Sequence, residues 1–208
     1  MLSLFVFLSF SGNHKYKAMK VLGINGSARK DGNTAIIINK IFSVLEKAGI
    51  ETELIQLAGN PVIGCQACYA CFKNKDGKCI NDDIVNECIE KMRLADGIIL
   101  GSPVYFADVT AGMKALIERA GFVSKANDNL FTHKAGVAVT AVRRGGAIHA
   151  FDSINHFFQY NQMFTVGSTY WNMVYGREIG EVEKDDEGMS NMENIGENLA
   201  FLLKKLKS

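Results

Sequence analysis

Short apolar segments that alternate with longer amphipathic ones constrain the fold of this chain more than any other feature. Residues 98–100 and 135–142 are almost wholly apolar, as expected for strands that are covered on both faces of a parallel sheet. Residues 34–48 carry apolar side chains at helical spacing, and Gly49 follows, a residue type that commonly ends helices. This alternation predicts an α/β fold: a doubly wound parallel sheet in a three-layer α/β/α arrangement.

The same patterns along the chain predict five strands and five helices. We expect strands at residues 20–25, 50–57, 98–100, 135–142 and 164–170. We expect helices at residues 34–48, 82–92, 110–120 and 147–160, and from about residue 190 onward. Longer surface connections are expected at 122–133 and 172–188.

The polarity of the second strand suggests how the sheet is ordered. Residues 50–57 alternate apolar and polar side chains, which suits an edge strand, so we predict the order 2-1-3-4-5 with right-handed crossovers. In such a sheet a ligand lies outside the carboxyl ends of the strands, where the order reverses. The connections that then face one site are 26–34, 64–80, 102–108 and 142–147.

The connection at residues 26–34 is a glycine-rich turn between the first strand and the first helix. Such a turn directs backbone N–H groups and the positive end of the helix dipole toward one point, which favours an anion. Side-chain hydroxyl and amide donors and one cation add to it. These residues are Ser27, Arg29, Asn33 and Thr34, with Gly32 at the turn. We interpret the loop as a cradle for a single terminal phosphate.

Other phosphate loops fit these residues less well. The Walker pattern requires Gly-Lys-Ser/Thr at the helix start, where this chain has Gly32-Asn33-Thr34, and the glycines are not spaced as in a dinucleotide-binding fingerprint. A plain strand–helix connection capped by Asn33 and Thr34 is the remaining alternative. Nine donor-rich residues are more than a cap needs, which favours the phosphate cradle.

The pattern Gly-Ser-x-Arg-x-x-Gly-Asn-Thr at residues 26–34 resembles the phosphate loop of the flavodoxin-like NAD(P)H-dependent FMN reductases. The segment Ser102-Pro103-Val104-Tyr105-Phe106 resembles the one that runs beside the isoalloxazine ring in that family. The resemblance covers residues 19–208 and implies a flavodoxin-like FMN-binding domain there. It also implies a homodimer or homotetramer, and FMN that accepts electrons from NADH or NADPH.

Two of these segments have specific expected roles at a flavin ring. Pro103 stiffens the 102–106 segment, and Tyr105 or Phe106 can stack on a flat ring, although two ordinary half-buried aromatic residues are the alternative. The loop Arg143-Arg144-Gly145-Gly146 places donors at a helix start, where they can contact the O2/N1 edge of the flavin. Two other roles remain open for these arginines. One of them could bind the phosphate of a nicotinamide cofactor, or both could lie in a solvated loop.

The chain has five cysteines, of which four are closely spaced. Cys88 falls on the apolar stripe of the 82–92 helix, so we expect it in the core. The others follow the pattern Cys65-x2-Cys68-x2-Cys71-x7-Cys79, which resembles the compact motif of the iron–sulfur flavoprotein branch and implies one 4Fe-4S cluster. No Pro follows Cys79, unlike in the bacterial ferredoxin run. Free or redox-labile thiols, and zinc or a disulfide, remain alternatives.

Composition narrows the class of partner. There are 23 Lys and Arg against 22 Asp and Glu, a formal net charge of +1, and no long basic block, which argues against nucleic acid. Residues 2–10 are apolar but too few to span a bilayer. We therefore expect residues 1–18 to be an N-terminal extension outside the core, with weak membrane contact as the alternative. No convincing secretion signal is present, which favours the cytoplasm and reduced thiols.

These features together predict an FMN-dependent NAD(P)H oxidoreductase of the flavin or quinone reductase type. Its electrons would pass to a small-molecule or protein acceptor, through the cluster if one is present. No side chain is expected to be catalytic, because FMN carries the chemistry. One alternative is an FMN electron-transfer protein without its own NAD(P)H turnover. Another is a flavin-free structural domain held by zinc.

Overall fold

The computed structural model describes residues 18–207. The predicted extension at residues 1–18 lies, apart from Ala18, outside the described residues. Among the residues that are described, no helix combines the length and the apolar character needed to cross a bilayer.

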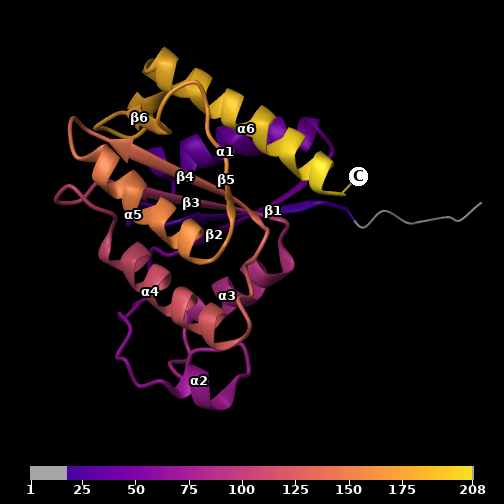
Figure 1. Ribbon diagram of the computed structural model, residues 1–208. Helices are drawn as coiled ribbons and strands as arrows, with labels where there is room; N and C mark the ends of the chain where they lie inside the picture. The colour runs from indigo at the N-terminus through magenta and orange to yellow at the C-terminus, as the bar shows by residue number, and fades with distance from the viewer. Residues whose placement is uncertain (1–17, 208) are drawn as a thin grey trace, which may run out of the picture.

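A parallel sheet forms the middle layer (Figure 1). Its strands are β1 (Lys20–Asn25), β2 (Glu51–Gln56), β3 (Gly97–Pro103), β4 (Ala135–Val142), β5 (Phe164–Thr165) and β6 (Met173–Tyr175). The order is β2-β1-β3-β4-β5, and β6 also pairs with β4. The predicted order 2-1-3-4-5 and the edge position of β2 are confirmed. All eight residues of β4 are buried, as its apolar sequence predicts.

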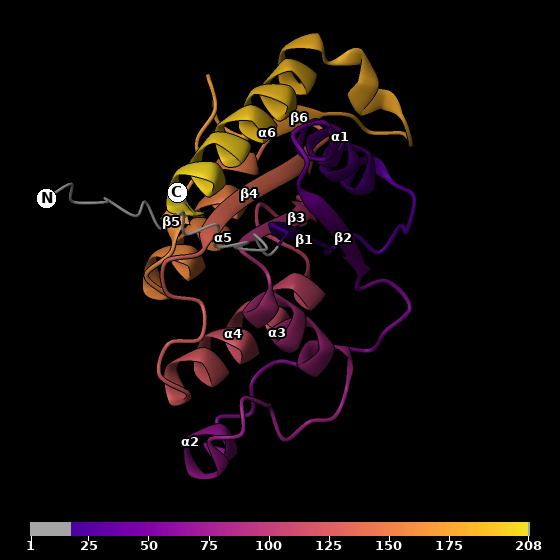
Figure 2. The same cartoon turned by 90° about the vertical axis from the view of Figure 1, so that its right-hand side faces the viewer.

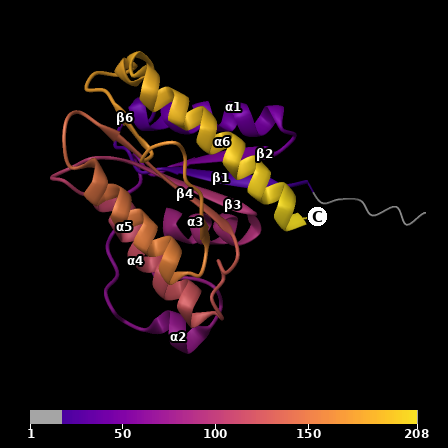
Figure 3. The same cartoon turned by 45° about the horizontal axis from the view of Figure 1, so that its top comes forward.

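Helices cover both faces of the sheet. The longer ones are α1 (Asn33–Lys47), α3 (Ile84–Leu94), α4 (Ala111–Ala126), α5 (Ala147–Tyr160) and α6 (Asp186–Lys207). A short helix, α2 (Ala70–Asn74), and the 3-10 turn η1 (Glu181–Lys184) lie in the connections. Helices α1 and α6 lie on one face, and α3, α4 and α5 on the other, as Figures 1 and 3 show. Each face has its own hydrophobic core.

The predicted fifth strand at 164–170 is wrong in its extent, so within the described residues the sheet has six strands rather than five. Strand β5 ends at Thr165, the chain leaves the sheet, and β6 then pairs with the carboxyl end of β4. Local side-chain bonds compete with the strand here: Ser168 Oγ donates to Asn172 Oδ1 at 2.8 Å. Asn172 Nδ2 then donates to the backbone oxygen of Ala138 at 3.0 Å and returns the chain to the sheet.

Two helix boundaries differ from the prediction by about four residues or more, and the others by at most two. Helix α4 continues to Ala126 instead of ending at residue 120, because its buried stripe extends through Val123. Helix α6 begins at Asp186 rather than near residue 190, with acidic residues in its first turn, where the helix dipole favours them. The helical spacing of apolar residues in the sequence also predicts that Ile148 and Leu206 face the core, but both side chains are exposed.

An ion-pair triad fixes the edge strand and gives a pH-dependent prediction. Glu53 of β2 pairs with Lys20 of β1 and Lys91 of α3. The hydrogen bond from Lys20, followed by that from Lys91, holds the pKa of Glu53 below its ordinary value of 4.5. The ionised Glu53 carboxylate therefore stabilises the fold at pH values above its ordinary pKa. This contribution is lost as the pH falls through the lower pKa that Glu53 has in the folded protein.

We expect Glu53→Gln to lower the free energy of unfolding by about 0.5–1 kcal/mol at neutral pH and to flatten its decline in acid. Urea denaturation at a series of pH values measures this. Glu51→Gln, on the same strand but exposed, is the matched control and is expected to change little. The prediction is contradicted if the free energy of unfolding declines equally in acid for Glu53→Gln and for the unaltered protein.

Candidate functional site

The turn between β1 and α1 is shaped by bonds to the neighbouring strands. The N–H of Gly26 donates to the carbonyl oxygen of Gly101 at 2.8 Å, and Gln56 Nε2 donates to the carbonyl oxygen of Ser27 at 2.8 Å. Within the turn, Ser27 Oγ accepts from the N–H of Arg29 at 3.0 Å. Strands β2 and β3 therefore hold the turn in place, while the Arg29 side chain stays exposed at its rim.

Thr34, in the first turn of α1, carries a buried hydroxyl group that suits an anion. The residue is 1% exposed, and Thr34 Oγ1 finds no hydrogen-bond partner within the described residues. Gly32 precedes the helix, and no described side chain caps its first turn. Buried polar groups are normally paired, and helix starts attract negative charge. These residues therefore fit a bound phosphate group.

Asn33 contacts a different part of the chain from the one we expected. Its Nδ2 donates to the carbonyl oxygen of Glu178, and its Oδ1 accepts from the N–H of Gly180, both at 2.9 Å. The side-chain amide thus joins the start of α1 to the connection before α6. Only the backbone N–H of Asn33 remains for the cradle that the sequence predicts.

The segment after β3 is tied to the same turn. Ser102 is fully buried; its Oγ accepts from the N–H of Thr110 at 3.0 Å and donates to the carbonyl oxygen of Pro103 at 2.8 Å. Thr110 Oγ1 donates in turn to the carbonyl oxygen of Gly26 at 2.7 Å. Ser102 therefore orders the protein around the predicted ligand, and its hydroxyl group is already engaged.

Tyr105 and Asp108 close a tight turn that presents two aromatic residues. The Tyr105 N–H donates to the Asp108 carbonyl oxygen at 2.8 Å, and the reverse bond is 3.0 Å. Between them, Phe106 and Ala107 have φ values of +49° and +61°, and Phe106 is fully exposed. Ser153 Oγ of α5 donates to Asp108 Oδ1 at 2.7 Å, which anchors the turn.

Tyr105 and the turn after β1 line one hollow at the carboxyl edge of the sheet. Its volume is about 320 Å³, which lies in the range of small-ligand sites. Its lining includes Gly26, Ser27, Ala28, Leu57, Asn60, Tyr105 and Thr110. The predicted anion cradle and the predicted ring-binding segment are thus neighbours, with Pro103 and Val104 half-buried behind them.

The 143–146 loop packs against the Tyr105–Asp108 turn. Gly146 has φ +87°, and a Cβ built on it would lie 2.7 Å from Ala107 Cα. Arg143, Arg144 and Gly145 are exposed. Arg143 also lines a separate hollow, which it shares with Tyr175, Arg177, Glu181, Lys184 and Asp185. The loop therefore lies beside the site, while Arg143 faces a second, charged recess.

The four spaced cysteines lie together but away from this hollow. They line one small pocket beside α4, which includes Cys65, Cys68, Cys71, Cys79, Tyr69, Arg119 and Phe122. Helix α2 carries this loop to the side of the molecule beyond α4, as Figure 2 shows. We expected the loop to lie beside the phosphate cradle. Instead the two hollows have no described lining residue in common.

The cysteine pocket has the donor chemistry of a thiolate-bound cluster. Four sulfur ligands from one loop are what an iron–sulfur cube requires, so the donor set fits. With the side chains as they stand, no three His, Cys, Asp or Glu residues in the described part form a metal-binding group. Burial raises the pKa of the Cys71 thiol, which favours its protonated form until a metal binds.

Arg119 is the pocket residue that sequence reasoning missed. It lies on α4, is 1% exposed, and donates from Nε to Cys79 Sγ at 3.2 Å. Burial alone lowers the pKa of its guanidinium, but the bonds to Asp83 and Cys79 outweigh this and raise it. The sequence does hold a signal for it. Arg119 lies three residues after Leu116, on the apolar stripe of the predicted helix, where a charged residue indicates a buried polar contact.

Residues 19–178 match the sequence pattern of the family described as NADPH-dependent FMN reductase. The chain belongs to this family. An iron-sulfur flavoprotein of Methanocaldococcus jannaschii is 38% identical over 204 residues, which cover 91% of this chain and 100% of that one. An iron-sulfur flavoprotein of Methanosarcina thermophila is 33% identical over 191 residues, which cover 91% and 97%.

Within the FMN reductase family, the chain falls in the iron–sulfur flavoprotein branch, as the cysteine spacing predicts. The fold is also similar to that of a WrbA-like flavodoxin from Agrobacterium tumefaciens, with a TM-score of 0.61 and 12% identity over 91% of this chain and 99% of that one. The predicted flavodoxin-like fold is confirmed. Membership of the FMN reductase family makes the protein an FMN-dependent oxidoreductase.

Proposed function

We propose that this protein transfers electrons from NADH or NADPH to FMN and then to an acceptor. The phosphate of FMN is held by the 26–34 turn and its ring lies against the 102–106 segment. The loop at residues 143–146 supplies donors near the O2/N1 edge. When bound, FMN supplies the redox chemistry, by accepting a hydride and passing electrons on.

The protein's own residues have positioning roles in this proposal. Ser27, the Thr34 hydroxyl group and the first N–H groups of α1 bind the phosphate, with Arg29 adding charge at the rim. Tyr105 forms a wall of the ring site, and Phe106 at the tip of its turn contacts the ring or the incoming substrate. Residues 19–208 would make up the FMN-binding domain.

The second part of the proposal concerns the cysteine pocket. Cys65, Cys68, Cys71 and Cys79 would hold one 4Fe-4S cluster, which when bound supplies one-electron transfer. The acceptor is a small molecule or a redox protein, the assembly a homodimer or homotetramer, and the compartment the cytoplasm. The relatives named iron-sulfur flavoproteins support the cluster.

The observation that carries the flavin proposal is the unpartnered hydroxyl group of Thr34. It lies at an uncapped helix start, at the end of the 26–34 segment whose residues Gly26, Ser27 and Ala28 line the Tyr105 hollow. A hydrogen bond to a charged oxygen contributes about 1.5 kcal/mol or more. We therefore expect Thr34→Val to weaken FMN binding about tenfold.

Titration of the flavin-free protein with FMN, followed by flavin fluorescence, measures this affinity. Thr140→Val is the matched control, because Thr140 in β4 is also buried and its hydroxyl group also has no partner among the described residues. The control is expected to leave FMN affinity unchanged. Equal effects of the two variants would refute the assignment of Thr34 to the phosphate.

Electron donation by nicotinamide is tested separately. We expect rapid bleaching of the flavin absorbance when the anaerobic protein is mixed with NADPH or NADH. The alternative, an electron-transfer protein that is closed to nicotinamide, predicts no bleaching with either nucleotide but full reduction by dithionite. That outcome would remove the NAD(P)H step and leave FMN binding intact.

A further inference from the structure

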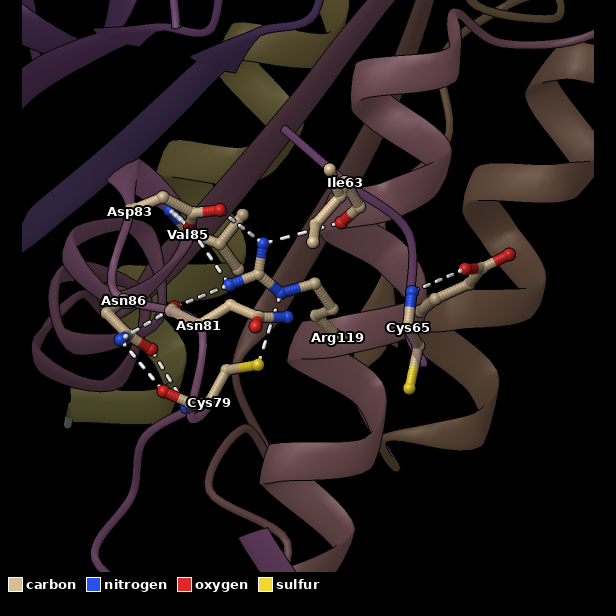
Figure 4. A network of polar contacts seen from close by, with 9 residues as sticks. Ile63, Cys65, Cys79, Asn81, Asp83, Val85, Asn86 and Arg119 are labelled. Atoms are coloured by element: carbon tan, nitrogen blue, oxygen red, sulfur yellow. Dashed lines mark hydrogen bonds and ion pairs between the residues drawn. The ribbon is translucent and has the colours of Figure 1, made fainter. Parts of the chain in front are cut away.

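A buried cation lies directly against the cysteine pocket. The Arg119 side chain has no solvent exposure, and among the described residues its polar contacts are all to the connection between β2 and α3, at Ile63, Cys79, Asn81 and Asp83. Figure 4 shows the guanidinium extending from α4 between Ile63, Asn81, Asp83 and the sulfur of Cys79. A buried guanidinium is costly unless every donor is paired, so this arrangement is strongly specified.

The five N–H donors of Arg119 are divided among four residues. Two form a fork with the carboxylate of Asp83, with Nη1–Oδ2 at 2.6 Å and Nη2–Oδ1 at 2.9 Å. Two reach the backbone oxygens of Asn81 and Ile63 at 2.8 and 3.4 Å. The fifth, Nε–H, donates to Cys79 Sγ at 3.2 Å. The Asp83 carboxylate and the two backbone oxygens therefore fix the plane of the guanidinium. Because the guanidinium is rigid, this also fixes the direction in which its Nε–H points toward the Cys79 sulfur.

Cys79 is held on its backbone as well as at its sulfur. Asn86 Oδ1 accepts from the Cys79 N–H at 2.8 Å, and Asn86 Nδ2 donates to the Cys79 carbonyl oxygen at 3.0 Å. Cys65 has one such bond, from its N–H to Glu118 Oε2 at 3.1 Å. The backbone clamp and the sulfur contact are thus made by different residues, which allows their effects to be separated.

We propose that Arg119 is a positioning residue that raises the reduction potential of the cluster held by the cysteine pocket. This inference rests on the cluster part of the proposed function. Reduction adds a negative charge to a thiolate-bound cluster. A hydrogen bond to a ligand sulfur stabilises the more negative state, and so does a nearby cation. Asp83 opposes the cation and, together with the backbone oxygens of Asn81 and Ile63, holds the fork in the orientation that the sulfur contact needs.

Two substitutions are expected to move the potential in opposite directions. Arg119→Lys keeps the positive charge but loses the planar fork and its Nε–H, so the potential falls. Asp83→Asn removes the counter-charge, and its amide oxygen still suits the helix cap that Asp83 makes with the Val85 N–H. One of the two fork acceptors is lost, but the backbone oxygens of Asn81 and Ile63 still hold the guanidinium, so the potential rises. We expect each substitution to change the equilibrium constant for reduction of the cluster about tenfold, which corresponds to ~59 mV for one electron.

The experiment is a redox titration of the anaerobically purified full chain, followed by the electron paramagnetic resonance signal of the reduced cluster. Iron and sulfide content are measured first, on each protein. Arg93→Lys, which changes an exposed arginine, is expected to leave the potential unchanged. Asn86→Ser loosens the bonds to the Cys79 backbone and one to the Asn81 carbonyl oxygen, but it leaves the contact between Arg119 and the Cys79 sulfur. It is expected to speed iron loss to a chelator without moving the potential.

The outcomes separate this inference from the function on which it rests. If the unaltered protein contains no iron or sulfide, it holds no cluster, and both the cluster proposal and this inference fail. The proposal that the protein binds FMN would still stand. A cluster whose potential is unchanged in both variants, or shifts the same way in both, overturns the role of Arg119 alone. If Arg119→Lys does not fold, Asp83→Asn decides: a higher potential supports the inference, and an unchanged or lower one overturns it.

Discussion

Replacing Phe158 by alanine is expected to lower the free energy of unfolding by about 3–5 kcal/mol. The side chain is fully buried on α5, and its ring lies over the backbone of Gly136 in β4, where a Cβ would approach the ring to 2.8 Å. Because Gly136 has no side chain, no side chain at that position of the strand can move into the space that the ring leaves. The cavity stays open, and its cost adds to the lost hydrophobic burial.

Urea denaturation followed by circular dichroism measures the loss. Phe164→Ala is the matched control, because Phe164 in β5 is 43% exposed and stacks on His133 at the surface. We expect the control to lose about 1 kcal/mol or less. Similar losses for the two variants would show that the region around Phe158 collapses, against this prediction.

Adding a methyl group at Gly146 is expected to cost about 2–5 kcal/mol of stability and at least about tenfold in FMN affinity. The stability loss has two sources. An L-residue at φ +87° is strained by about 1–2 kcal/mol, and its Cβ would lie 2.7 Å from Ala107 Cα, which adds about 1–3 kcal/mol of overpacking. Backbone cannot give way as a flexible side chain can, so the Tyr105–Asp108 turn must move away from the predicted ring site.

Gly145 provides the control within the same loop. A Cβ there meets nothing within 4 Å, and its φ is not in the left-handed region, so Gly145→Ala is expected to keep both stability and affinity. Thermal unfolding and FMN titration of the two variants test the prediction. It is contradicted if Gly146→Ala binds FMN as tightly as Gly145→Ala does.

The parts of the fold that sequence predicted well have uniform local patterns. Residues 135–142 are almost wholly apolar, and the strand has those bounds. Cys88 falls on an apolar helical stripe; it is fully buried, and burial raises the pKa of its thiol to about 12. In both cases the residue's neighbours in sequence determine its environment, so a local pattern is sufficient.

The features that sequence missed depend on partners far away in the chain. Asn33 bonds to Glu178, 145 positions later, and Arg119 reaches Cys79, 40 positions earlier. Residues 164–170 have strand-like composition, but the bond between Ser168 and Asn172 ends β5 early. The candidate phosphate cradle was recognisable because its donors are contiguous, whereas the cysteine pocket is completed by α4, which no cysteine spacing reveals.

The division of the last strand into β5 and β6 also affects how the protein can associate. A continuous edge strand offers a row of unpaired backbone groups on which another chain can assemble. Here one edge consists of two residues of β5 and three of β6, separated by a connection that leaves the sheet. The other edge, β2, carries Glu51 and Glu53. Neither edge is a good template for adding strands from another molecule, so this architecture resists fibrous aggregation and leaves self-association to helical and loop surfaces.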